Sequence, residues 1–285
     1  MNQRVATSTT PSLGEHAAPR RGLRPGPVLA VAVLALLVLP VATLVIFSLA
    51  RGYFYPQLIP GDWSLRAWRV LLRPGSEVWG AIVTTTLVGL AVVVAALAVA
   101  IPAGRSLGRH TFRGKRLVEF LLLAPLLAPP VVVAMGLDFA FLRLHLTNNF
   151  WGVVLVHLVP TVPYAVFIMS GVFANYDPAP EGQARTLGAT RLRAFRYVTL
   201  PAIAPGVVVA AVLVLIVSWS QYVLTLLIGG GQVVTLPILL FATSTGGDTA
   251  LTSALALITI APVLLLLLVA SRHVSRMPAA RIGAR

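Results

Sequence analysis

The chain alternates between long apolar runs and shorter polar segments. Six runs of roughly 20 apolar residues are present, and a helix of that length spans about 30 Å of hydrocarbon. They lie at about 28–50, 78–104, 117–142, 150–172, 203–229 and 250–270. This pattern predicts an all-α, polytopic membrane protein with six transmembrane helices.

The segments outside these runs set the expected domain boundaries. Residues 1–26 contain Ser, Thr, Pro and Arg without periodicity, which predicts a disordered tail. One membrane domain over 27–272 follows, with a polar loop at 173–202, and a short tail covers 273–285. Ser48-Leu49-Ala50 resembles a signal-peptide cleavage site, but the preceding run is longer than a typical signal core. We therefore interpret it as a retained first span.

Two further patterns concern packing and a loop. The segment Ala91–Ala100 is rich in small residues, which predicts close approach to another helix. After Gly229-Gly230-Gly231, the segment 232–249 is less polar than an ordinary exposed loop. A re-entrant segment and a surface loop are equally compatible with its length.

Composition supports membrane insertion and excludes several kinds of site. Apolar residues make up 58% of the chain and charged residues 11%, whereas a soluble domain has about a quarter charged residues. The mean hydropathy is +0.90. The chain has no cysteine, so disulfides, thiolate metal sites and cysteine nucleophiles are excluded.

The net charge of +14 raises the alternative of nucleic-acid binding, but its distribution favours another explanation. Seventeen of the 22 Lys and Arg residues fall in the segments 1–24, 105–116, 173–202 and 272–285. With six spans, these segments all lie on one side of the membrane. The positive-inside rule therefore places them, and both termini, in the cytoplasm. No nucleic-acid partner is expected.

The loop at 173–202 carries signals for a short helix. Asp177 is a candidate N-cap with Pro178 just inside the helix, and Glu181 favours the positive end of the dipole. Ala184 and Leu187 would share one face, and the helix should break near Gly188.

A second short helical stretch is expected at 190–198, ending at Leu200-Pro201 before the fifth span. Its apolar and Arg positions suit either anionic lipid or a groove on a partner protein. These physical arguments alone leave the two alternatives open.

This loop resembles the EAA loop of bacterial ABC-importer permeases. That pattern runs Glu-Ala-Ala, three residues, Gly, nine residues and Ile-x-Leu-Pro. Val198 stands at the Ile position, and Gly182 and Gln183 stand where Glu and the first Ala are expected, with Glu181 one place early. The residues in register are Ala184, Gly188, Leu200 and Pro201.

The resemblance implies a MetI-like ABC-importer permease fold and a set of partners. These are a cytoplasmic ABC ATPase dimer, a second permease subunit (a related chain or a second copy) and an extracytoplasmic solute-binding protein. The chain would be a transport subunit in a bacterial inner membrane, without cofactors. It has no Gly-x-x-x-x-Gly-Lys-Ser/Thr phosphate loop, so ATP hydrolysis would belong to the partner. The expected ATPase-coupling residues are Glu181, Ala184, Arg185, Leu187, Gly188, Leu200 and Pro201.

Within the family, the chain looks most like permeases for polyamines, thiamine or ferric iron. The shared features are the run Ser218–Tyr222 in the fifth span and the later Thr235-Leu236-Pro237. The resemblance implies a small polar cargo of one of these kinds. The expected translocation-pathway residues are Ser218, Ser220, Gln221 and Tyr222.

Polar side chains inside spans are functional candidates because their burial in lipid is costly. For His157 we favour a helix–helix hydrogen bond over a substrate contact. No pair of carboxylates or histidines has metal-ligand spacing on one helix face, so no metal site is expected. Two alternatives are an ATP-independent secondary transporter, which usually shows repeats and buried ionisable groups, and an intramembrane enzyme. We find neither a convincing repeat nor a nucleophile–base motif.

Overall fold

The computed structural model describes residues 27–51 and 60–275, and these are helical apart from turns, connections and one isolated bridge between Ala50 and Trp63. The chain divides after Ala42 into two compact units, the first of which contains the N-terminal part of the first helix. The predicted disordered tail 1–26 lies outside the described residues. Of the predicted tail 273–285, the first three residues extend the last helix and the others lie outside the description.

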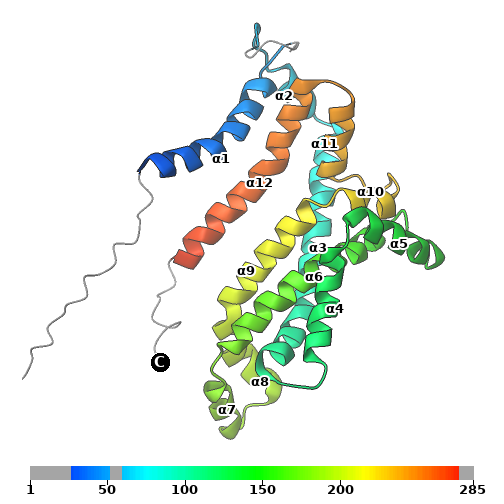
Figure 1. Cartoon of the computed structure of the whole chain (residues 1–285). Helices are drawn as coiled ribbons and strands as arrows, with labels where there is room; N and C mark the ends of the chain where they lie inside the picture. Colours follow the sequence, from blue (N-terminus) through cyan, green and yellow to red (C-terminus); the bar gives the residue numbers. More distant parts are fainter. Residues whose placement is uncertain (1–26, 52–59, 276–285) are drawn as a thin grey trace, which may run out of the picture. The chain divides into compact units, whose positions relative to one another are not determined.

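The helices follow the predicted apolar runs closely (Figure 1). In chain order they are α1 (Pro27–Ser48), α2 (Arg66–Leu71), α3 (Glu77–Arg109), α4 (Lys115–Leu127), α5 (Pro130–Arg143), α6 (Phe150–Ala174), α7 (Ala179–Thr186), α8 (Arg191–Ala194), the π-helix η1 (Phe195–Thr199), α9 (Leu200–Trp219), α10 (Val223–Gly229), α11 (Leu236–Thr245) and α12 (Thr249–Ser275).

Membrane-spanning length is reached by four described helical stretches: α3, α6, the continuous stretch Arg191–Trp219 and α12. The bent pair α4 and α5 makes a fifth if it is one span. Helix α1, with 22 residues, covers the first predicted run. The all-α class is confirmed, and four or five of the six predicted spans reach spanning length in the described residues, whereas α1 covers most of the remaining run.

The third predicted span, 117–142, is broken rather than continuous. α4 ends at Leu127, α5 begins at Pro130, and the two helices are bent by 103°. Ala128 is extended (φ −84°, ψ 142°) because the ring of Pro129 disfavours the helical conformation of the residue before it. The predicted run is therefore two helices joined at this proline pair, which is the geometry of a broken span or of a re-entrant loop.

The fifth predicted span, 203–229, is also divided. α9 ends at Trp219, and α10 is a separate helix of seven residues. The indole Nε1 of Trp219 donates to the carbonyl of Thr259 on α12 at 3.0 Å, so the end of α9 is attached to α12.

Segment 232–249 contains α11, whose ten residues rise about 15 Å, half of the hydrocarbon thickness. It therefore does not cross the membrane.

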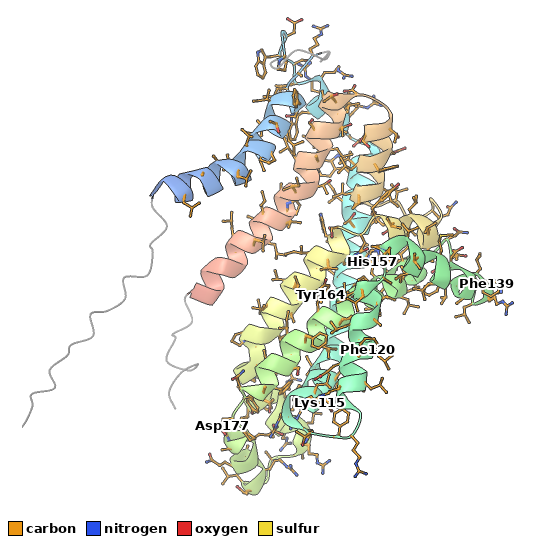
Figure 2. The ribbon with its side chains drawn as sticks, in the orientation of Figure 1. Lys115, Phe120, Phe139, His157, Tyr164 and Asp177 are labelled. Carbon is orange, nitrogen blue, oxygen red and sulfur yellow. The ribbon has the colours of Figure 1, made fainter. Side chains whose placement is uncertain are left out.

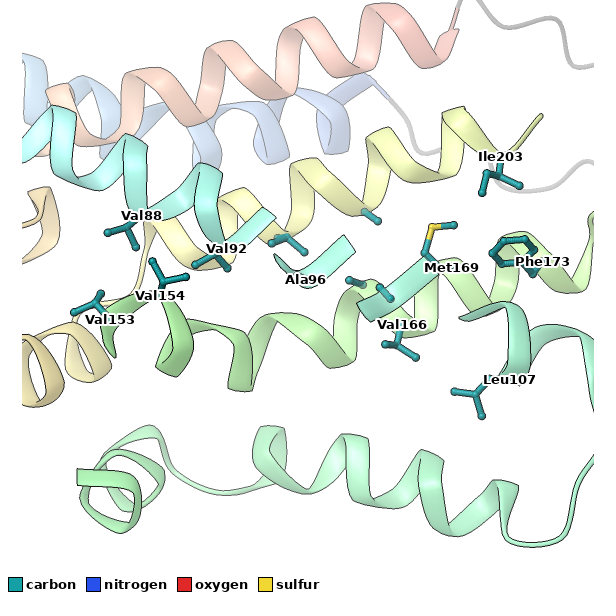
Figure 3. Packing of buried hydrophobic residues seen from close by; sticks show 14 of the residues in the cluster. Val88, Val92, Ala96, Leu107, Val153, Val154, Val166, Met169, Phe173 and Ile203 are labelled. Carbon is teal, nitrogen blue, oxygen red and sulfur yellow. The ribbon is translucent and has the colours of Figure 1, made fainter. Parts of the chain in front are cut away.

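The core of the second unit lies between α3, α6 and α9 (Figure 3). Ala96, Ala100, Gly104 and Gly108 recur every four residues on α3 and bring its backbone against α6. A Cβ on Gly104 would lie 2.5 Å from Cβ of Met169. The predicted close packing at Ala91–Ala100 is confirmed and continues to Gly108, because the small-residue spacing is maintained.

Most of α4 and α5 faces outward. Among their described side chains only Ala134 is buried, whereas Leu127 and Met135 are 74% and 65% exposed. Such an apolar surface suits hydrocarbon or another membrane helix. At one end of α3, α6 and α9 lie α7 and α8, whereas α2 and α11 lie towards the other end (Figure 1).

Candidate functional site

The loop between α6 and α9 folds into the predicted short helix, shifted by one residue. Asp177 Oδ1 accepts from the amide of Ala179 at 2.9 Å, which satisfies a free amide at the start of α7. Pro178 is the residue before the helix rather than its first residue. α7 ends at Thr186, and Gly188 then has φ +93°, so the predicted break is confirmed.

The second short stretch does not stop before the fifth span. α8 continues through η1 into α9 without interruption, so the predicted end at Leu200-Pro201 was wrong. The amide of Leu200 donates to the carbonyl of Phe195, which is the wider π spacing. This widened turn directly precedes Pro201, whose ring and missing N–H would disturb a regular α-helix.

Glu181 turns towards the bundle rather than away from it. Its Oε1 accepts from Nη2 of Arg105 on α3 at 2.7 Å, and its Oε2 accepts from the hydroxyl of Thr199 at 2.9 Å. Tyr176 donates its hydroxyl to Thr199 Oγ1 at 3.3 Å. Burial alone would raise the pKa of Glu181. The hydrogen bonds from Arg105 and Thr199 and the charges of Arg105 and Arg109 outweigh it, so the pKa of Glu181 is lowered.

The remainder of this loop is exposed and both apolar and basic. We call it the α7–η1 surface and define it by exposed side chains of residues 185–197. Leu187, Leu192 and Tyr197 are 88%, 74% and 72% exposed. The exposed arginines of the surface are Arg185, Arg191, Arg193 and Arg196. A shallow depression in it is lined by Gly182, Arg185, Thr186, Ala189, Thr190 and Arg191.

The predicted coupling residues therefore divide into two groups. Arg185, Leu187 and Gly188 lie on the α7–η1 surface, Pro201 is exposed outside it, and Ala184 is half-buried. Leu200 packs against the core of α3, α6 and α9, and Glu181 bonds to α3. The contribution of Arg105 was missed because it lies 76 residues before Glu181 and reads as one of many loop arginines.

The predicted pathway residues surround the break between α9 and α10. Ser218 is buried, whereas Ser220 is exposed and donates to the carbonyl of Val217 at 3.1 Å. Gln221 is half-buried. The half-buried Tyr222 stacks on Phe241 of α11 with ring centroids 4.6 Å apart. The structure thus gathers these side chains at one break but turns them in different directions.

His157, labelled in Figure 2, lies on α6 and connects this helix to α9 and α10. Its Nδ1 lies 2.9 Å from Ser218 Oγ, and its Nε2 lies 2.8 Å from Thr225 Oγ1. Because the hydroxyl of Thr225 donates to the carbonyl of Gln221, it accepts from His157 Nε2–H. Nδ1 then accepts from Ser218. The predicted helix–helix hydrogen bond is present, and the missed partner Thr225 belongs to α10, beyond the break that follows α9.

Towards the other end of the unit, Asp248 joins α2 to α12. It pairs with Arg66, and its Oδ1 accepts from the amide of Leu251 at 3.0 Å, which caps α12. Burial would raise the pKa of Asp248, but the hydrogen bond and charge of Arg66 and the amides of Leu251 and Ala250 lower it overall. Sequence reasoning did not find this pair, since its members are 182 residues apart.

A family of known transport proteins matches most of the chain. The model for the binding-protein-dependent transport system inner membrane component matches residues 100–277, which include the α7–η1 surface and the Ser218–Tyr222 run. The chain is 28% identical over 155 residues to the spermidine/putrescine transport system permease protein PotC of Haemophilus influenzae, covering 54% of this chain and 60% of the relative. It is 29% identical over 170 residues to the trehalose transport system permease protein SugB of Mycobacterium tuberculosis, covering 60% and 62% respectively. The matched region thus spans about three fifths of each relative.

Solved structures agree on the fold. A chain of a bacterial ABC transporter involved in the import of the acidic polysaccharide alginate superposes with a TM-score of 0.66 at 18% identity, over 86% of this chain and 94% of that chain. The resemblance to the MetI-like permease fold is therefore confirmed at the level of architecture. The family model matches well over half of the chain. The chain therefore belongs to the family of binding-protein-dependent transport system inner membrane components.

Proposed function

We propose that this chain is the transmembrane permease subunit of an ATP-driven, binding-protein-dependent ABC importer. It forms half of a translocation pathway and couples through residues 177–201 to a separate ATPase. Its partners are a cytoplasmic ATPase dimer, a second permease subunit and an extracytoplasmic solute-binding protein. It is a multi-pass protein of a bacterial inner membrane with both termini in the cytoplasm, and it is not itself an enzyme.

The exposure of the α7–η1 surface is the observation that carries this proposal. Full burial of a large apolar side chain stabilises a protein by about 1.5–3 kcal/mol. Leu187, Leu192 and Tyr197 gain little of this within the described chain, since each is more than two thirds exposed. A partner groove that covers them would gain it, and short helices commonly bind in that way.

The charge of the surface indicates what the groove must present. Four exposed arginines flank the apolar side chains, and the carboxylate of Glu181 is paired with Arg105 rather than with one of them. A groove with an apolar floor and carboxylates at its rim fits this arrangement. Anionic lipid would also attract the arginines, so lipid binding without an ATPase is the competing alternative for this surface.

Coupling requires that α7 makes different contacts in different states of the ATPase. Docking alone shifts no equilibrium, since a ligand acts only through its differential affinity for two conformations. When ATP closes the ATPase dimer, the two docked loops approach each other. The spanning helices then switch from inward-facing to outward-facing.

The pathway itself is assigned to the break between α9 and α10. Ser220, Gln221 and Tyr222 offer hydroxyl and amide groups where the helix is interrupted, as transporters do at their substrate sites. The hydroxyl of Ser218 donates to His157, so Ser218 fixes α9 to α6 and supports this segment without lining the pathway.

The cargo is a small polar solute, with a polyamine, thiamine or ferric iron as the candidates. Relatives of similar identity are named for a polyamine and for the disaccharide trehalose, which supports selection by the solute-binding protein rather than by the permease. A binding assay on the solute-binding protein of the same transporter, with these solutes as probes, tests this assignment.

The decisive experiment replaces one exposed leucine. Leu187→Glu should abolish co-purification of the ATPase and ATP-driven uptake, while the amount of protein in the membrane stays unchanged. Leu144→Glu is the matched control, because Leu144 is 65% exposed in a different loop. Unchanged ATPase binding and uptake in Leu187→Glu, or uptake that needs no ATP, would contradict the proposed function and favour a secondary transporter.

A further inference from the structure

We infer that Glu181, Arg105 and Thr199 form a link through which movement of α7 reaches the spanning helices α3 and α9. We call these three residues the 181 link. The inference rests on the proposed function, since it assumes that α7 is moved by an ATPase. It assigns Glu181 to positioning inside the permease rather than to contact with the partner.

In the 181 link, the carboxylate of Glu181 bonds to two different residues, one with each oxygen. One carboxylate oxygen of Glu181 accepts from Arg105 Nη2 at 2.7 Å, and the other accepts from Thr199 Oγ1 at 2.9 Å. Arg105 belongs to α3, and Thr199 is the last residue of η1, directly before α9. A single side chain of α7 therefore contacts two different spanning helices.

The carboxylate and hydroxyl of the 181 link are largely protected from solvent, whereas the side chain of Arg105 is 34% exposed. The side chain of Glu181 is 12% exposed and Thr199 is fully buried, whereas Leu187 on the same loop is 88% exposed. Charge-assisted hydrogen bonds of this kind are shorter and stronger than neutral ones, and partial burial reduces competition from water. A partner that covers the α7–η1 surface leaves the 181 link in place.

Apart from the 181 link, α7 lies against α8 and η1 of the same loop. It has eight residues, none of them buried, and helices of this length are not stable in isolation. Its apolar side chains therefore do not attach it to the core. The hydrogen bonds of Glu181 supply the lateral attachment that would make α7 and the bundle move together.

The receiving end of the link is rigid. Arg105 lies between Gly104 and Gly108, where the backbones of α3 and α6 are in contact. A Cβ on Gly108 would lie 2.4 Å from the carbonyl oxygen of Ser170, so no side chain separates the backbones of α3 and α6 there. Displacement of Arg105 consequently displaces α3 and α6 as one body.

The experiment compares docking with coupling in the reconstituted transporter. In Glu181→Gln, we expect ATPase co-purification within twofold of wild type and continued ATP hydrolysis. Uptake per ATP hydrolysed should fall at least tenfold, which a merely structural defect would not produce. Thr199→Val should lower the same ratio by a smaller factor. Arg113→Gln, in an exposed neighbouring loop, is the matched control and should leave it unchanged.

Reconnection of the link provides a second arm. The chain has no cysteine, so Arg105→Cys with Glu181→Cys gives a unique reactive pair. A bifunctional methanethiosulfonate that bridges the two should restore coupling, and a monofunctional reagent should not.

The outcomes separate this inference from the proposed function. Wild-type uptake per ATP in Glu181→Gln, or loss of ATPase binding in that variant, would overturn the role of the 181 link while leaving α7 as the docking helix. Retention of ATPase binding in Leu187→Glu would instead overturn the docking role itself.

Discussion

The contact between α3 and α6 gives a prediction whose size follows from the structure. Gly104→Ala would place a Cβ 2.5 Å from Cβ of Met169, 2.8 Å from its carbonyl carbon and 2.9 Å from the amide nitrogen of Ser170. Two of these are backbone atoms and the third is fixed to the backbone. No rotamer change relieves the overlap, so the two helices must separate.

The expected cost is that of overpacking a buried contact. Such substitutions destabilise by about 1–3 kcal/mol, which is about 5- to 140-fold in the folding equilibrium. For a chain of this size the melting temperature should fall by about 2–12 °C, at about 2–4 °C for each kcal/mol. The helical preference for Ala over Gly opposes this by about 0.5–1 kcal/mol.

The assay is thermal unfolding of the purified protein in detergent, with Gly80→Ala as the matched control. Gly80 lies on the same helix, but a Cβ there meets nothing within 4 Å. Gly80→Ala should leave the melting temperature unchanged or raise it slightly. Equal melting temperatures for the two variants would refute the close backbone contact of α3 and α6.

Three more predictions follow from local geometry. Gly188→Ala should cost about 1–2 kcal/mol because φ is +93°, whereas Gly182→Ala, also in open space but helical, should cost nothing; thermal unfolding compares them, and equal stability would contradict the left-handed turn. A double-mutant cycle of His157→Leu and Ser218→Ala should give a coupling energy of about 0.6–1.7 kcal/mol, and a value near zero would argue against their hydrogen bond. Because the pKa of Glu181 is lowered in the folded protein, its carboxylate stabilises the fold fully above the ordinary pKa of 4.5, and this stabilisation is lost as the pH falls through the lower folded pKa. Glu181→Gln should therefore flatten the acidic part of a plot of melting temperature against pH. An unchanged slope would count against the ion pair.

The helices were predictable from the sequence because each apolar run is long and membrane burial leaves few alternatives. α6 begins at Phe150 as expected, and α1, α3 and α12 differ from the predicted runs by a few residues at their ends. The breaks inside two runs were not predicted, and the end expected at Leu200-Pro201 is absent because α8 and η1 continue into α9. At Ala128-Pro129 the break has a local cause in the sequence, the proline ring, whereas the end of α9 at Trp219 depends on tertiary contacts that hydropathy does not report.

The candidate site was predictable in its location and not in its contacts. The N-terminal signal at Asp177 and the turn at Gly188 are local, so they could be read from the sequence. The direction of Glu181 could not, because it is decided by Arg105 on another helix. The bond between His157 and Thr225 likewise depends on how three helices meet.

A photocrosslinker at one position tests the central claim most directly. We would place benzophenone on Leu187→Cys in the otherwise cysteine-free chain, assembled with the ATPase of the same transporter, and use Leu144→Cys as the control. The account predicts that position 187 is joined to the ATPase subunit, that the yield changes when ATP is added, and that position 144 gives no such product. Crosslinks from position 187 to lipid alone, in a complex that still transports, would contradict it.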